Sequence, residues 1–139
     1  MFKVSQISFC NKLVPNLVDD KDKHEVMDSL KANYNLTYDF KDSLSLKDNF
    51  CKNVASNKHV FVVNSTGNNY LLYLTRHNGN NLCLFIDRKT KQGHKFPRIL
   101  SVKYKFAEEL FQGTLFSGEL IQVNGNSKFV FTDIYTYLG

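Results

Sequence analysis

The chain has 139 residues, a net charge of +5 at pH 7 and a hydrophobic share of 42%. These values allow one hydrophobic core but not two. No run approaches the roughly 18 apolar residues of a membrane span, and the amino-terminal segment lacks the apolar stretch of a signal peptide. We therefore expect one soluble, cytoplasmic domain without a membrane segment.

Cysteine and histidine usage excludes two further classes of protein. The three cysteines are scattered singly, which argues against a disulfide framework. The four histidines share no ligand spacing with them, so we expect no metal site. The cysteines are Cys10, Cys51 and Cys83, and the histidines are His24, His59, His77 and His94.

The first 57 residues are polar, and the clearest element that they predict is one helix. In "DDKDKHEVMDSLKANY", Val26, Leu30 and Tyr34 recur at a spacing of four, as on the buried side of an amphipathic helix. Asp19 and Asp20 stand where an N-cap and first-turn acids belong.

Two other features of this amino-terminal part are less specific. Pro15 predicts a break in regular structure before the helix. The segment 35–53 alternates weakly between polar and apolar residues, which fits either a short strand or an extended crossing segment.

From Lys58 onward the sequence predicts strands joined by turns. "HVFVVN" (59–64), "YLLYLT" (70–75) and "LCLFID" (82–87) are β-rich runs. The Gly- and Asn-containing turns "STGNN" and "RHNGNN" separate them, so we expect an antiparallel meander.

The remaining elements complete an α+β chain that is mainly antiparallel sheet with one or two short helices. "ILSVKY" is a candidate fourth strand, and "KFAEELFQG" a short helix that ends at Gly113. "TLFSGELIQV" and "KFVFTDIYTYL" form two closing strands around "NGNS". We divide the single domain, 1–139, into a helix-containing part, 1–57, and a sheet, 58–139.

The closing strands carry a family resemblance. In "TLFSGELI", Gly118 and Glu119 follow Ser117, and in "KFVFTDIYTYLG" the aromatic Phe131 precedes Asp133. This order resembles the N-terminal half of the covalent nucleotidyltransferase superfamily, which contains mRNA capping guanylyltransferases and nucleic-acid ligases. The family has Asp-Gly-Glu where this chain has Ser-Gly-Glu. The resemblance implies that Phe131 packs near the base of a nucleotide.

The resemblance also implies that the catalytic nucleophile is missing. In the family, the lysine of Lys-x-Asp-Gly attacks the α-phosphate of a nucleotide. In "VVNSTGNN", Gly67 matches the glycine of that motif, but Asn64 replaces the lysine and Thr66 the aspartate. An asparagine amide is not nucleophilic, and the later Glu-Gly and Lys-x-Lys motifs have no counterpart. We therefore expect a degenerate, truncated domain with no catalytic residue and no cofactor.

Basic residues gather in "DRKTKQGHKFPR" and "SVKYKF". Interleaved with Phe96, they are candidates to contact RNA phosphates and stack a base. A solvated, lysine-rich hairpin is the alternative interpretation. The candidate residues are Arg88, Lys89, Lys91, Lys95, Arg98, Lys103 and Lys105.

These observations together predict a module that binds. We expect a small accessory subunit of an RNA polymerase or capping machinery, as in a virus-like element or cytoplasmic linear plasmid, with RNA as a further candidate partner. An exposed apolar edge on the last strand would favour this hypothesis. The alternatives are a cap- or nucleotide-binding protein that uses Phe131 and Glu119, and one half of a split enzyme. An ordinary meander with a chance Gly-Glu pair is the structural alternative.

Overall fold

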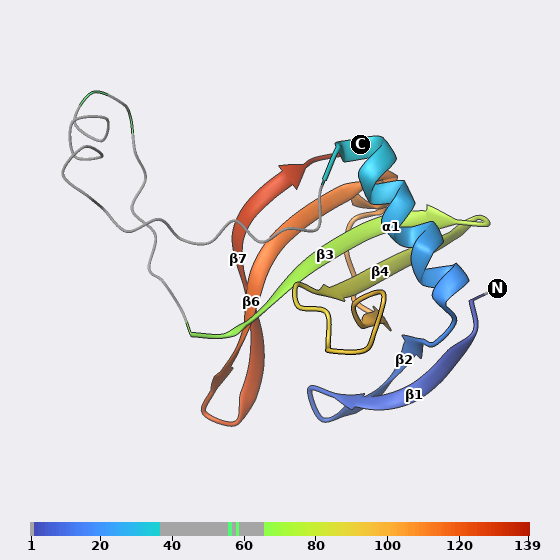
Figure 1. Ribbon diagram of the computed structural model, residues 1–139. Helices are drawn as coiled ribbons and strands as arrows, with labels where there is room; N and C mark the ends of the chain where they lie inside the picture. Colours follow the sequence, from blue (N-terminus) through green and yellow to red (C-terminus); the bar gives the residue numbers. More distant parts are fainter. Residues whose placement is uncertain (1, 37–55, 57, 59–65) are drawn as a thin grey trace.

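One helix packs on a large antiparallel sheet in the part of the chain that the structure describes. The computed structural model describes residues 2–36, 56, 58 and 66–139. In these residues the helix α1 (Asp20–Tyr34) covers one face of a seven-stranded sheet (Figure 1). The expected α+β class with a dominant antiparallel sheet is therefore confirmed. Among the same residues, no helix is long and apolar enough to cross a membrane.

The sheet has the spatial order β1-β2-β5-β4-β3-β6-β7. β3, β4 and β5 form a meander, whereas β6 returns to the other side of β3. The connection between β5 and β6 contains the 3₁₀-helix η1, which contacts β3 and β4. The bounds are β1 Val4–Phe9, β2 Lys12–Leu17, β3 Asn68–His77, β4 Asn80–Asp87, β5 Ile99–Val102, η1 Glu108–Gln112, β6 Thr114–Val123 and β7 Asn126–Thr136.

The predicted helix is confirmed with its cap. The side chain of Asp19 accepts a hydrogen bond from the Lys21 backbone N–H at 2.9 Å, which satisfies one of the free donors of the first turn. Val26 and Leu30 are buried against the sheet. The helix ends at Asn35, whose φ of 50° places it in the left-handed region.

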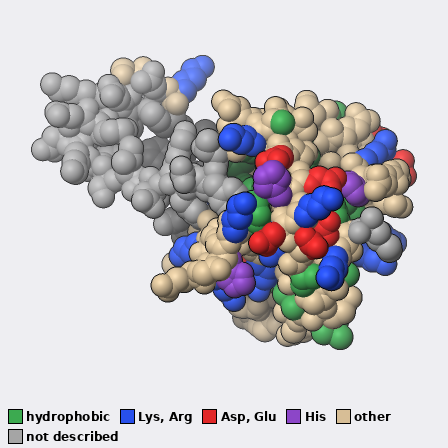
Figure 2. Space-filling model, turned by 45° about the vertical axis from the view of Figure 1, so that its right-hand side comes forward, with side chains coloured by type: hydrophobic (Ala, Val, Ile, Leu, Met, Phe, Trp, Pro, Cys, Tyr) green, Lys and Arg blue, Asp and Glu red, His purple; other side chains and the backbone are tan. Residues whose placement is uncertain are grey.

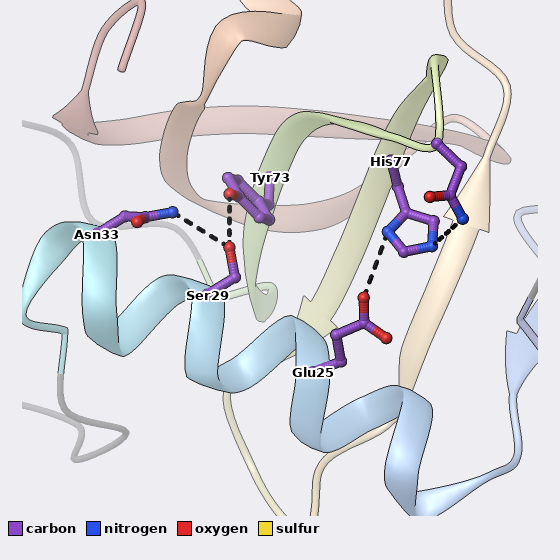
Figure 3. A network of polar contacts seen from close by, with 6 residues as sticks. Glu25, Ser29, Asn33, Tyr73 and His77 are labelled. Atoms are coloured by element: carbon purple, nitrogen blue, oxygen red, sulfur yellow. Dashed lines mark hydrogen bonds and ion pairs between the residues drawn. The ribbon is translucent and has the colours of Figure 1, made fainter.

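Polar contacts fix α1 on β3 (Figure 3). The hydroxyls of Ser29 and Tyr73 lie 3.3 Å apart, and Asn33 donates to Ser29 at 3.2 Å. About one turn nearer the start of α1, a carboxylate oxygen of Glu25 lies 3.5 Å from Nδ1 of His77. These polar contacts join the helix to β3, while the apolar side of the helix packs against the sheet and is buried there.

The expected break at Pro15 is wrong, because Pro15 lies inside β2. β1 and β2 form a hairpin whose turn residues, Cys10 and Asn11, have φ of 51° and 62°, as a type I′ turn requires. β2 makes a single ladder pair with β5, Asn16 with Leu100, so the missing N–H of a proline is tolerated there. The predicted strand 59–64 and nearly all of segment 35–53 lie outside the described residues.

The later turns follow the prediction from sequence. Asn78-Gly79 and Asn124-Gly125 have positive φ at both positions, which joins β3 to β4 and β6 to β7 by tight hairpins. Gly113 has a φ of 118° and caps η1, so the short helix expected there is a 3₁₀ turn that ends at the expected glycine.

The sheet is curved around one of its two hydrophobic clusters (Figure 1). On the face opposite α1, Phe9 from the first hairpin packs with Phe85 from the middle of the sheet, and Phe129 from β7 also packs on Phe85. The turns of the two outer hairpins line the same cavity of about 290 Å³. The curvature thus brings both ends of the sheet toward each other, and one aromatic core is shared by strands from both halves of the chain.

Candidate nucleic-acid interface

Two of the motif residues, Gly67 and Glu119, meet across the sheet. The backbone N–H of Gly67 donates to Oε2 of Glu119 at 3.2 Å, across 52 residues of sequence. The pairing of Asn69 with Glu119 in the β3–β6 ladder sets this position. A Cβ on Gly67 would lie 2.7 Å from the carbonyl oxygen of Leu120, so the position requires glycine.

Gly118 is required for packing. A Cβ at this position would meet the carbonyl oxygen of Val130 and lie 2.6 Å from Cζ of Phe129. The register between β6 and β7 shifts at the neighbouring pair, between Ser117 and Gly118. The Gly-Glu pair thus has a structural explanation that does not depend on a bound nucleotide.

The register places the other motif residues on opposite faces of the sheet. Asp133 pairs with Ser117, two residues before Glu119 on β6, so both acids project from the same face. Phe131 pairs with Gly118 and packs on Phe116, on the other face. Phe131 and Glu119 therefore do not form one pocket, and the structure does not assemble the base-binding pair that the cap-binding alternative requires.

The remaining motif positions add no chemical group to this face. Thr66 is exposed, two residues before β3 begins, and Asn64 lies outside the described residues. The carboxylate of Asp133 accepts from its neighbouring backbone N–H, that of Ile134, at 2.8 Å. Among the described residues, no three His, Cys, Asp or Glu side chains are arranged to hold a metal ion.

Arg98 of the predicted basic segment is held by three hydrogen bonds. Its guanidinium makes two hydrogen bonds to the carboxylate of Asp87, at 2.9 and 3.2 Å, and a third to Oη of Tyr70 at 3.0 Å. This bidentate geometry is the strong form of an ion pair. Arg98 therefore brings a charge that Asp87 already balances.

The contact gives Tyr70 an unusual titration. Burial, and then the negative charge of Asp87, raise the pKa of Tyr70 to about 12. An unfolded tyrosine ionises near pH 10, so the folded state holds this proton more tightly and loses stability as pH rises from about 10 through 12. We expect urea unfolding to show a larger loss of stability between pH 8 and 11 for the wild type than for Tyr70→Phe. An equal loss would contradict the raised pKa.

Two adjoining cavities surround the 88–98 loop, and we call them together the basic cleft. They measure about 340 and 370 Å³ and share Lys91 and Arg98. The first is lined also by Gly67, Asn68, Asn69, Tyr70, Asp87 and Lys89. The second is lined also by Ile7, Ser8, Asn16, Lys23, His94 and Phe96. Cations outnumber acids in both cavities, which favours an anionic ligand.

The other predicted phosphate contacts lie elsewhere. Arg88 donates to Ser117 at 3.0 Å and to Tyr135 at 3.3 Å. Lys95 lies over the ring of Phe96, 5.3 Å from its centroid. Lys103 lines the separate 290 Å³ cavity between the outer hairpins.

β5 separates the two basic segments. Lys91 precedes this four-residue strand, whereas Lys103 and the exposed Lys105 follow it. The face shown in Figure 2 carries acidic, basic and histidine side chains intermixed. Of the predicted basic residues, Lys89, Lys91 and Arg98 line the cleft, whereas Lys103 lines a different cavity.

The cleft also contains polar residues of the amino-terminal part that were not among the predicted site residues. Lys23 on α1, Asn16 on β2 and Ser8 on β1 line its second cavity, and the pairing of β2 with β5 brings the first hairpin to it. One signal was available for Lys23, which precedes Val26 by three residues and therefore lies on the buried side of the helix.

No known family model matches this chain, and no curated protein matches its sequence.

Proposed function

We propose that this chain is a non-catalytic, nucleotidyltransferase-like module that binds RNA as a small accessory subunit of a transcription or mRNA-capping complex. The basic cleft is the observation that carries the proposal. Lys89 and Lys91 are exposed at its first cavity and have no acid directly paired with them among the described residues. Lysine side chains of this kind supply the phosphate contacts of RNA-binding surfaces.

The position of the cleft supports the same proposal. Its first cavity is lined by Gly67 and Asn69, at the start of β3, which is where the nucleotidyltransferase resemblance would bring a phosphate. Asn64 offers no amine to attack it. A phosphate held at this point is bound but not transferred.

The last strand supports a protein partner. β7 is an edge of the described sheet, and Phe131, Ile134 and Tyr135 are exposed along it. Exposed apolar residues on an edge strand are typical of a surface that another chain covers. The cap-binding alternative has less support, because it needs Phe131 and Glu119 in one pocket.

RNA binding is tested by changing the two exposed lysines of the cleft. We expect Lys89→Ala with Lys91→Ala to lower affinity for a fluorescent 12-nucleotide RNA by about tenfold in an anisotropy titration. The slope of log K against log salt should fall by about 1.4, because each phosphate contact on a single strand contributes about 0.7.

The matched control is the double variant Lys12→Ala with Lys128→Ala. It removes the same charge from positions outside the basic cleft. An equal loss of affinity in both double variants would mean that only net charge matters, and the cleft would not be the binding site.

The subunit role is tested by co-purification in moderate salt. We expect the tagged chain to retain a large RNA polymerase or capping-enzyme chain in near-equal amount, and Ile134→Lys to release it, because the charge falls on the exposed side of β7. The matched variant Lys128→Glu changes an exposed charge on the same strand. Recovery of the wild-type chain alone would contradict the subunit role and leave RNA binding to stand or fall separately.

A further inference from the structure

Lys23 is a charged residue at a core position of α1. It lies on the same side of the helix as Val26 and Leu30, which pack on the sheet. Only 8% of Lys23 is exposed, and among the described residues its side chain makes no hydrogen bond or ion pair. Its ammonium is not among the buried, unpaired polar atoms of these residues, because Lys23 lines an open cavity. A sheltered cation without a counter-charge at a cavity favours an anionic ligand.

A buried polar atom without a partner belongs to another residue of the same cavity. Oδ1 of Asn16 is buried and has no hydrogen-bond donor, although Nδ2 of the same amide donates to Ser5 at 3.4 Å. Buried polar atoms are almost always satisfied in folded proteins. Lys23 and Asn16 both line the 370 Å³ cavity of the basic cleft, so an unpaired cation and an unsatisfied amide oxygen belong to the lining of one cavity.

The rest of the lining defines the chemistry of the ligand. Lys91 and His94 add cationic or donor groups, Arg98 adds a guanidinium that is already paired with Asp87, and none of the residues that line this cavity is acidic. Phe96 supplies an aromatic wall. The volume is within the 300–1,000 Å³ typical of small-ligand pockets. This combination suits a compact anion attached to an organic group that carries a hydroxyl or amine donor.

We propose that this cavity binds the terminal phosphate group of a nucleotide or of an RNA 5′ end. The ammonium of Lys23 and the side chain of Lys91 contact the phosphate oxygens, and Oδ1 of Asn16 accepts from a hydroxyl or amine of the same ligand. The inference rests on the proposed function, because the cavity shares Lys91 and Arg98 with the site proposed for RNA. Of the two cavities of the cleft, Lys23 and Asn16 line only the second. Variants at these two residues therefore test the terminal-phosphate site separately from the proposed RNA binding.

The test compares three fluorescent RNAs of one sequence that carry a 5′-triphosphate, a 5′-monophosphate or a 5′-hydroxyl. We expect the wild type to prefer the phosphorylated ends by about tenfold or more, the factor that one charge-assisted hydrogen bond supplies. Lys23→Met should abolish this preference without changing affinity for the 5′-hydroxyl RNA. Lys21→Met is the matched control, because Lys21 is exposed on the same helix.

A second variant keeps the proposal testable if Lys23→Met fails to fold. Asn16→Asp keeps the shape of the side chain and supplies Lys23 with a counter-charge, so it should also abolish the preference for phosphorylated ends. A wild type that binds all three RNAs equally would overturn the proposed terminal-phosphate site and leave RNA binding intact. A wild type that binds none of them would contradict the proposed function instead.

Competition with free GTP and ATP distinguishes the two sources of the phosphate. If either nucleotide displaces the triphosphate RNA from the wild type, and binds the Lys23→Met variant about tenfold more weakly, the cavity accepts a free nucleotide. If neither competes while the RNA preference holds, the ligand is an RNA 5′ end. Equal effects of Lys23→Met and Lys21→Met on every ligand would overturn the proposal.

Discussion

Phe85→Ala is expected to destabilise the protein by about 3–5 kcal/mol, the usual cost of removing a large aromatic side chain from a core. Phe85 is 1% exposed. Its ring lies 5.5 Å from that of Phe9, 5.7 Å from Tyr70 and 5.0 Å from Phe129. These neighbours come from the first hairpin, the centre of the sheet and the last strand, so the cavity left by alanine would affect all three.

Urea unfolding of the variant measures this effect, and Phe131→Ala is its control. Phe131 is 49% exposed at the edge of the sheet, so its loss should cost about 1 kcal/mol or less. Equal destabilisation by both substitutions would contradict a shared aromatic core centred on Phe85. The same comparison tests the fold without reference to any ligand.

Asp87→Asn is expected to change stability and RNA affinity in opposite directions. The substitution keeps the shape of the side chain but removes the charge that balances Arg98. Stability should fall by about 2 kcal/mol, below the 3–5 kcal/mol of a fully buried pair, because 32% of the Arg98 side chain is exposed. RNA affinity should rise several-fold, since the first cavity of the basic cleft loses its acid.

Urea unfolding and RNA anisotropy measure the two effects on the same preparation, and Arg98→Met together with the double variant Asp87→Asn with Arg98→Met completes the cycle. The double variant should recover part of the lost stability, because neither charge then remains without its partner. It should also lose the gain in RNA affinity. A fall in both quantities for Asp87→Asn alone would mean that the ion pair only holds the loop in place.

Local sequence was sufficient for the elements whose signals are short-range. The α1 helix follows from the spacing of Val26 and Leu30 and from the cap at Asp19. The Asn-Gly turns at 78–79 and 124–125 follow from the tolerance of these residues for positive φ. For these elements, the physical cause lies within a few residues of the feature itself.

The first hairpin could not be found in this way. Its turn residue Cys10 has a φ of 51°, although cysteine carries no preference for such a turn. Pro15 signalled a break, yet it is tolerated because β2 pairs with β5 at one position only. The strand β2 therefore depends on its pairing with Leu100 of β5, which lies more than 80 residues later in the chain.

The candidate site shows the same division. The sequence by itself determined which chemical groups are present: a Gly-Glu pair, an asparagine at position 64, and an excess of lysine. Only the tertiary structure decided which of them meet. Strand register put Gly67 against Glu119 and turned Phe131 to the other face, because a side chain's face depends on its partner strand. Packing of α1 and β2 then brought Lys23 and Asn16 to the loop that carries Lys91.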